Sequence, residues 1–208
     1  MYSTVESLKR IVRESLENAE QGRSKLPRDV EMLNGMSSPN IRRFLNNVCF
    51  YGPCNYLEIG IWSGSTFVPA QYGNDTLAVG IDSFTQFQEQ NPREQLNQNL
   101  LKYGPNMKEY QIVEGDCFME FKNVNHEANV FFYDGSHGEH ETRTAIEIYG
   151  KKCAKPFILI VDDWELTDSV KVGTMKALEQ FNVHETWVKT KEDLWHMGLF
   201  IAVLEARA

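Results

Sequence analysis

The chain has 208 residues, of which 42% are hydrophobic and 24% are charged. This balance predicts one compact domain over 1–208, with an N-terminal helical cap over 1–50 and an α/β domain over 51–208. The formal net charge is −8 and no basic run stands out, so we expect no nucleic-acid partner. No apolar run approaches membrane-spanning length, which excludes a membrane protein of the helical class.

Two features of the sequence indicate the compartment. Lys9, Arg10 and Arg13 interrupt the first apolar positions, which is not the pattern of a signal peptide. The spacing of the four cysteines suits neither a zinc site nor a dense disulfide framework; they are Cys49, Cys54, Cys117 and Cys153. We therefore expect reduced thiols in a cytoplasmic protein.

The first fifty residues predict two helices. Apolar residues recur at helical spacing over 3–20, and Ser3 with Glu6 fits a capping box. After a looser stretch over 21–37, Ser38 and Pro39 mark the start of a second helix. These helices can pack on their own domain or on another subunit, so the sequence is compatible with both a monomer and a homo-oligomer.

From Asn55 onward, strands and helices alternate. We expect strands at 55–60, 76–82, 110–114, 128–134 and 157–162, with helices starting near Ser65, Asn91, Cys117 and His137. The runs 130–133 and 157–161 are continuously apolar, which is typical of strands covered on both faces of a parallel sheet. A helix from Asp168 to about Phe181 is followed by segments 183–189 and 197–204, which predict a hairpin.

A glycine turn follows the first of these strands. Residues 56–66 place Glu58 before Gly60 and Gly64, and Ser65 and Thr66 at the mouth of the next helix. Glycine lets the backbone turn sharply and lets a ligand approach it, although such turns also serve as plain strand–helix connections. The spacing differs from the Gly-x-Gly-x-x-Gly turn of dinucleotide binders, which argues against an NAD-dependent oxidoreductase.

This turn resembles motif I of the class I S-adenosylmethionine-dependent methyltransferases, and the resemblance runs roughly from Tyr56 to Glu205. It implies a Rossmann-like α/β fold, doubly wound, with a mostly parallel seven-stranded sheet that ends in an antiparallel hairpin. It also implies S-adenosylmethionine as cofactor. The residues that it places at the cofactor are Glu58, Gly60, Trp62, Gly64, Ser65, Thr66, Asp82, Ser83, Asp116, Cys117 and Asp134.

Two of these acids have a reason of their own. Asp82 ends the second strand about 20 residues after Gly60, the spacing of ribose-binding carboxylates in related folds. Asp116 ends the third strand, where the resemblance places the adenine. Both side chains are also suited to cap the helix that follows, and the two roles are compatible.

Three further carboxylates follow the fourth and fifth strands: Asp134, Asp162 and Asp163. If these strands are neighbours, the carboxylates converge, and their mutual repulsion is relieved by a divalent cation. Oxygen ligands favour Mg²⁺, Mn²⁺ or Ca²⁺ over zinc. The alternative for Asp162 and Asp163 is a solvated strand end.

The same residues resemble the metal-dependent O-methyltransferases. The run from Asp134 to His137 is similar to the branch that modifies sugars, which implies metal binding by Asp134, Asp162 and Asp163 and makes Asp134 and His137 the catalytic candidates, with His137 as the base. The catechol type has Asn where this chain has Asp163, so Asp163 either binds the metal or orients a ligand. The alternative for His137 is a capping role, because histidine is common near the start of a helix.

The sequence thus predicts methyl transfer from S-adenosylmethionine to a hydroxyl of a small molecule, with a sugar or polyol as one acceptor class. The alternatives are a non-catalytic nucleoside-binding module on the same fold and an NAD-dependent oxidoreductase. Trp62 and Trp164 either line the pocket or pack in the core. The segments 21–40 and 83–95 are expected to shape the acceptor pocket, but they carry no interpretable motif.

Overall fold

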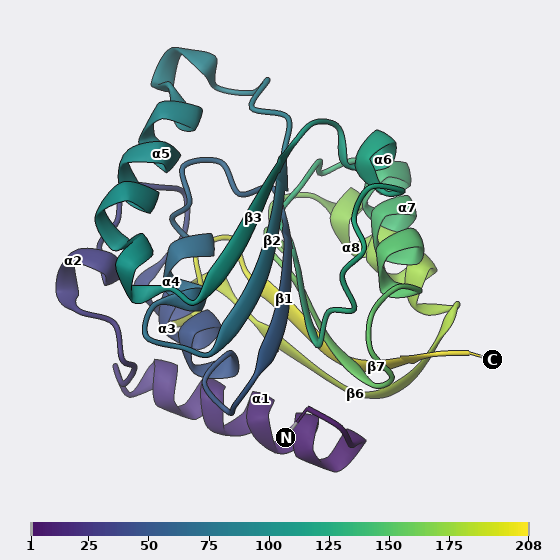
Figure 1. Cartoon of the computed structure of the whole chain (residues 1–208). Helices are drawn as coiled ribbons and strands as arrows, with labels where there is room; N and C mark the ends of the chain where they lie inside the picture. The colour runs from purple at the N-terminus through teal and green to yellow at the C-terminus, as the bar shows by residue number, and fades with distance from the viewer. Residues whose placement is uncertain (1, 208) are drawn as a thin grey trace.

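The computed structural model describes residues 2–207 and contains a seven-stranded sheet in the order β3-β2-β1-β4-β5-β7-β6 (Figure 1). β7 runs antiparallel to both of its neighbours, and the other paired strands are parallel. The predicted sheet and its terminal hairpin are therefore confirmed. The strands are β1 Cys54–Ile59, β2 Thr76–Asp82, β3 Glu109–Glu114, β4 Val130–Tyr133, β5 Phe157–Val161, β6 Phe181–Lys189 and β7 Leu199–Ala206.

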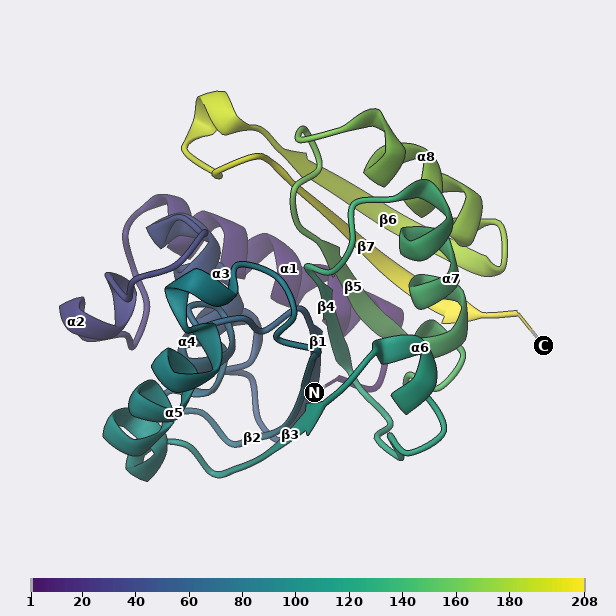
Figure 2. The same ribbon diagram turned by 90° about the horizontal axis from the view of Figure 1, so that it is seen from above.

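Helices cover both faces of the sheet (Figure 2). One face carries α1 Val5–Glu20, α2 Arg28–Glu31, α3 Pro39–Val48, α4 Phe67–Gln71 and α5 Pro92–Tyr103. The other carries α6 Cys117–Glu120, α7 Glu139–Gly150 and α8 Asp168–Leu178. Short 3-10 turns lie at η1 Gln88–Gln90, η2 Gly104–Asn106 and η3 Lys191–Asp193.

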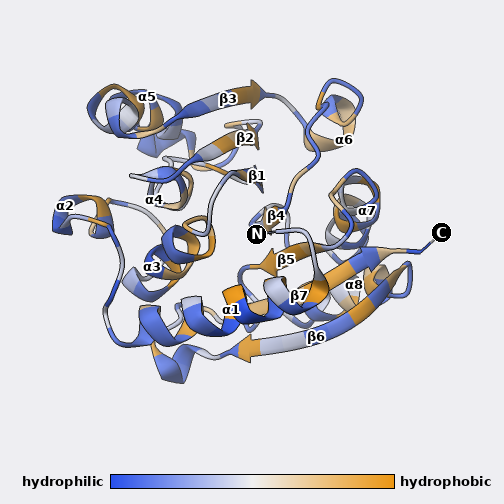
Figure 3. Ribbon diagram, turned by 60° about the horizontal axis from the view of Figure 1, so that its bottom comes forward, coloured by the Kyte–Doolittle hydropathy of each residue, from blue (hydrophilic) through white to orange (hydrophobic). Residues whose placement is uncertain are grey.

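The sheet separates two apolar clusters. Alternate residues of the strands point to opposite faces, so Ile158 and Ile160 of β5 join the cluster under α1 and α3, whereas Leu159 and Val161 join the one under α7 and α8. Figure 3 shows the sheet running between the two helix layers, with the helices polar on their outer sides. Both faces of β4 and β5 are buried, as their continuous apolar runs predicted.

The N-terminal helices pack on their own chain. Tyr2 donates a hydrogen bond of 2.6 Å to the carbonyl of Val48, and Arg13 of α1 pairs with Glu185 of β6 at 2.6 Å. The second helix begins as predicted, because Ser38 accepts a hydrogen bond from the Ile41 N–H and Pro39 occupies its first turn. No helix among residues 2–207 is long and apolar enough to cross a membrane.

The predicted capping box of α1 is wrong. Thr4, which has an extended backbone, is the N-cap, and its partner is Ser7; the Ser7 N–H donates to the Thr4 hydroxyl at 3.2 Å. Because the helix starts at Val5, Glu6 falls in the first turn and pairs with Lys9 instead of reaching back to the cap. Ser3 lies outside the helix.

The strand order reverses direction at β1, whose neighbours are β2 on one side and β4 on the other. In open α/β sheets this switch point opens a crevice at the carboxyl ends of the strands, and ligands bind there. Gly60 follows β1 and Asp134 follows β4, so the topology brings both predicted site residues to this crevice.

Candidate functional site

Gly60 lies against the chain that follows β4. Its backbone has φ +91°, and a Cβ placed on it would lie 1.8 Å from the carbonyl oxygen of Asp134. Glycine is therefore required here by the contact between two chain segments. This reason differs from the sequence interpretation, in which glycine made room for a ligand. The same contact fixes Asp134 beside the glycine turn.

Asp82 ties the end of β2 to the glycine turn. One carboxylate oxygen accepts a hydrogen bond of 2.8 Å from the Trp62 N–H, and the other accepts one of 2.7 Å from the Phe84 N–H. Trp62 and Phe84 both have a left-handed backbone, with φ 42° and 52°. Each carboxylate oxygen keeps a further lone pair, so the geometry leaves Asp82 able to bind ribose hydroxyls. That role stays a prediction.

Glu58 lies beneath the turn and is fully buried. Its carboxyl oxygens accept hydrogen bonds from the hydroxyl of Tyr56, at 2.5 Å, and of Thr66, at 2.6 Å. Burial raises the pKa of Glu58 to about 8. The observed task of this side chain is to hold Thr66 at the start of α4, and its expected contact with a ligand stays a prediction.

A segment from the N-terminal part of the chain covers the glycine turn. Ser65 and Thr66 are buried, and a Cβ on Gly35 would lie 2.2 Å from the side chain of Ser65. The hydroxyl of Ser63 donates to the carbonyl of Asn34 at 3.1 Å. α4 starts two residues later than the predicted helix start at Ser65 and has only five residues, so its dipole contributes little to anion binding.

A buried arginine holds this covering segment in place. Arg42 of α3 donates hydrogen bonds to the carbonyls of Glu31, Leu33 and Ser37, at 2.8, 2.6 and 3.1 Å. Burial lowers its pKa to about 10. Neither Arg42 nor Gly35 was predictable as part of the site, because an arginine in an amphipathic helix and a glycine in a loop give no signal of such contacts.

Asp116, after β3, caps the helix that follows, which is one of the two roles predicted for it. Asp116 is the N-cap of α6, and its carboxylate accepts a hydrogen bond of 2.8 Å from the Phe118 N–H. The carbonyl of Cys117 accepts one from the Tyr149 hydroxyl at 2.7 Å, and the Ser83 hydroxyl pairs with that of Thr85 at 2.8 Å. Contacts of Ser83, Asp116 and Cys117 with an adenine stay predictions.

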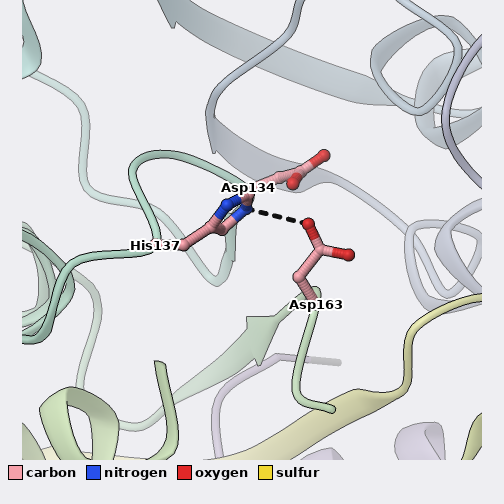
Figure 4. Close-up of side chains that lie close together, drawn as sticks. All are labelled: Asp134, His137 and Asp163. Atoms are coloured by element: carbon pink, nitrogen blue, oxygen red, sulfur yellow. Dashed lines mark ion pairs between the residues drawn. The ribbon is translucent and has the colours of Figure 1, made fainter. Parts of the chain in front are cut away.

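Asp134, His137 and Asp163 converge at the adjacent ends of β4 and β5 (Figure 4). Each offers a ligand atom, and these atoms lie within 4.8 Å of one another. His137 Nε2 is 2.8 Å from Asp163 Oδ2. The N-cap of α7 is Gly138, so His137 precedes the helix and does not cap it. The side chain of His137 is 41% exposed and that of Asp163 is 15% exposed. The imidazole therefore faces solvent, while the carboxylate that it contacts is mostly buried.

Asp162 directly precedes Asp163 but is not among the three residues whose ligand atoms converge in the described part of the chain, so the predicted metal set of Asp134, Asp162 and Asp163 is brought together only in part. Asp162 is 2% exposed, and neither of its carboxylate oxygens has a hydrogen-bond partner in the described part of the chain. Burial, followed by repulsion from Asp163, raises the pKa of Asp162 well above its usual range. Burial and the charges of Asp162 and Asp163 raise the pKa of Asp134 in the same way.

These carboxylates fit a hard divalent cation. The Asp162 oxygens, which lack hydrogen-bond partners within residues 2–207, and the carboxylates of Asp134 and Asp163 repel one another, so these acids must either hold protons or bind positive charge. All three predicted ligands supply oxygen atoms, which suits Mg²⁺, Mn²⁺ or Ca²⁺. His137, and not Asp162, shares the converging group with Asp134 and Asp163, and its imidazole contacts Asp163. Metal binding by Asp134, Asp162 and Asp163 stays a prediction.

The two tryptophans differ. Trp164 is 9% exposed and stacks on Phe200 of β7 with ring centroids 4.5 Å apart, which is a packing role. Trp62 stands in the glycine turn with its indole N–H buried and without a partner in the described residues. Trp62 therefore remains a candidate for the cofactor pocket, as the sequence predicted.

The fold is shared with solved methyltransferases. The O-methyltransferase TomG from Streptomyces achromogenes, solved in complex with S-adenosylmethionine, superposes with a TM-score of 0.63 at 15% identity, covering 93% of this chain and 90% of TomG. This chain has the class I S-adenosylmethionine-dependent methyltransferase fold. An O-methyltransferase from Bacillus cereus in complex with S-adenosylhomocysteine gives 0.59 at 13% identity, covering 97% of this chain and 92% of that one.

TrmN from Thermus thermophilus also has this methyltransferase fold. It gives a TM-score of 0.59 at 12% identity and matches 86% of this chain, but the chain spans only 52% of TrmN. No protein-family model matches the sequence, and no curated protein matches it. At these identities the likeness establishes the fold, and the activity has to be argued from the site.

Proposed function

We propose that the chain transfers a methyl group from S-adenosylmethionine to a hydroxyl of a small molecule, assisted by a divalent cation. The observation that carries this proposal is the placement of the carboxylate cluster directly beside the glycine turn, through the contact between Gly60 and Asp134. Methyl transfer requires donor and acceptor to be held in line and close together, and this adjacency supports their closeness. The resemblance of the run from Asp134 to His137 to the sugar-modifying branch supports a sugar or polyol acceptor.

The cofactor side of the crevice is formed by the turn from Gly60 to Thr66 and by Asp82. When bound there, S-adenosylmethionine supplies a methyl carbon whose bond to sulfur breaks, with its electron pair left on sulfur, as the acceptor oxygen attacks. Asp82 would bind the ribose hydroxyls with the lone pairs that Trp62 and Phe84 leave free. The segment around Gly35 shields the turn from water.

The acceptor side is formed by the cluster. Asp134, Asp162 and Asp163 would hold the cation, which lowers the pKa of a hydroxyl that it binds. His137 accepts the hydroxyl proton and releases it to solvent through its exposed edge. Asp163 fixes the orientation of the imidazole through the 2.8 Å contact with Nε2, which leaves Nδ1 to face the acceptor.

Two measurements test this proposal. Calorimetric titration with S-adenosylmethionine and with NADH should give heat for the first ligand alone; heat for NADH alone would replace the proposal with the oxidoreductase alternative. Transfer of a labelled methyl group to a panel of sugars, polyols and catechols should be lost in EDTA, while cofactor binding is kept. Cofactor binding without transfer to any acceptor would favour the non-catalytic module, and full transfer in EDTA would remove the metal.

A further inference from the structure

An open groove of about 480 Å³ lies between the N-terminus of α3 and the loop that joins β6 to β7. Ser38, Pro39 and Arg43 line it from α3, and Lys191, Leu194 and His196 line it from the loop. In Figure 2 the tip of the β6–β7 hairpin lies beside the N-terminal helices. None of the roles described above uses this groove.

Both walls of the groove are bonded to the proposed catalytic crevice. The loop wall continues into Met197 and Gly198, whose carbonyls accept hydrogen bonds from the N–H groups of Glu165, at 2.7 Å, and Trp164, at 3.2 Å. Those two residues directly follow Asp163. The helix wall follows the segment at Asn34 and Gly35, which covers the glycine turn. Backbone hydrogen bonds on one wall and chain continuity on the other therefore link the groove to the crevice.

The loop wall has a backbone that presents side chains to the groove. Trp195 is fully buried and packs edge-on against Phe44 of α3, with ring centroids 6.0 Å apart. On either side of it, Leu194 and His196 have left-handed backbones with φ 68° and 55°, a conformation rare outside glycine. Trp195 thus anchors the loop to α3, while its two neighbours stay exposed at the groove.

The charge of the groove is opposite to that of the chain. Its lining contains Arg43, Lys191 and His196 and, among the described residues, no acidic side chain, although the chain carries a net charge of −8. Arg43 contacts Glu31 and Asn40, whereas the Lys191 ammonium forms no ion pair within residues 2–207. Cationic groups that gather in a concave surface attract and orient anionic ligands.

We propose that this groove binds an anionic group, a carboxylate or a phosphate, on the hydroxyl compound that the enzyme methylates. Lys191 supplies the main charged contact and Arg43 a second one, while Leu194 and Pro39 cover an apolar part of the same molecule. The proposal rests on the proposed function, because it assigns the acceptor of that reaction. A carboxylate and a phosphate share the chemistry of charge-assisted hydrogen bonds with these side chains.

The test compares matched pairs of probes that differ by one anionic group. Binding of 3,4-dihydroxybenzoate against catechol, and of glucose 6-phosphate against glucose, is measured by calorimetry on the protein with S-adenosylhomocysteine and Mg²⁺ present. In at least one pair the anionic member should bind about tenfold more tightly or better, as expected for a charged hydrogen bond. Lys191→Gln should remove most of that preference, and Arg43→Gln part of it.

The control is Lys171→Gln, which removes a lysine from α8 on the opposite face of the sheet and should leave the preference unchanged. Equal binding within both pairs, or no binding by any probe, overturns the proposal. A preference that survives both Lys191→Gln and Arg43→Gln also overturns it. Failure of S-adenosylhomocysteine itself to bind counts against the proposed function instead, so the two failures are distinguishable.

Discussion

The carboxyl of Asp162 is buried and has no hydrogen-bond partner among residues 2–207. Its substitution should therefore change the free energy of unfolding in opposite directions without and with a bound metal. We consider Asp162→Asn, which keeps the size of the side chain and removes its titration. Burial and the neighbouring Asp163 raise the pKa of Asp162 in the folded protein, whereas in the unfolded chain it titrates near about 3.9. Between these two pKa values the folded protein holds a proton that the unfolded chain has released.

The direction in which the free energy of unfolding changes with pH follows from this difference in bound protons. Because the unfolded chain binds fewer protons, the free energy of unfolding of the metal-free wild type falls as pH rises, by up to about 1.4 kcal/mol per pH unit for this group. The contribution is fully present below the unfolded pKa and is lost as pH rises through the folded pKa. Asp162→Asn lacks this loss, so its free energy of unfolding should rise relative to that of the wild type as pH increases above the unfolded pKa, by up to about 1.4 kcal/mol per pH unit.

A bound cation reverses the comparison. At a Mg²⁺ concentration 100 times Kd, the wild type gains about 2.7 kcal/mol, and the variant, with a weaker ligand, gains much less. The assay is urea unfolding of both proteins at pH 5, 6, 7 and 8, each in EDTA and in Mg²⁺. Asp168→Asn, whose side chain is 95% exposed at the start of α8, is the matched control and should change neither profile.

Two results would refute this reasoning. If Asp162→Asn lowers stability in EDTA by the same amount at every pH, Asp162 is not an uncompensated buried acid. If the variant keeps the full Mg²⁺ response, Asp162 is not a ligand, and the cation site is restricted to the residues around His137.

Three more substitutions test the remaining roles. Asp82→Ala should weaken S-adenosylmethionine binding by about 1.5–3 kcal/mol in calorimetry, through lost charged hydrogen bonds, and an unchanged Kd would reject the ribose role. His137→Gln should lower kcat by about 10²–10⁴-fold in the methyl-transfer assay with the cofactor Kd unchanged; an effect confined to KM would assign it to acceptor binding. The pKa of Glu58 is raised to about 8, so Glu58→Gln should flatten the loss of stability between pH 5 and 8 in urea unfolding; a slope equal to that of the wild type would contradict this.

The position of a strand or the start of a helix was predictable where the residue pattern itself determines burial or backbone conformation. The continuous apolar runs at 130–133 and 157–161 can satisfy the burial of both faces only in the interior of a sheet, and β4 and β5 lie there. Ser38 and Pro39 fix the start of α3 through the cap and the preset φ of proline. The start of α1 was missed because Ser3, Thr4 and Ser7 are all competent caps, and only the backbone chooses among them.

The convergence of carboxylates was predictable, but their individual surroundings were not. Parallel strands end at one edge, so Asp134 and Asp163 had to meet if β4 and β5 are neighbours. Whether a given oxygen is bonded, buried or free depends on packing from segments far away in the sequence. The glycine turn illustrates this. Glu58 beneath the turn contacts Tyr56 of its own strand, which is near in sequence. The segment that covers the turn, in contrast, comes from Gly35 and is held by Arg42.

The backbone of Asp163 explains how its carboxylate contacts His137 while that of Asp162, one residue earlier, stays buried. In a regular strand, neighbouring side chains point to opposite faces, but Asp163 has a left-handed φ of 55° and so leaves the strand pattern of Asp162. Asp and Asn tolerate this conformation better than other residues with a Cβ. One oxygen of Asp163 contacts His137 Nε2 at 2.8 Å, so this imidazole is the group that Asp163→Asn would affect first.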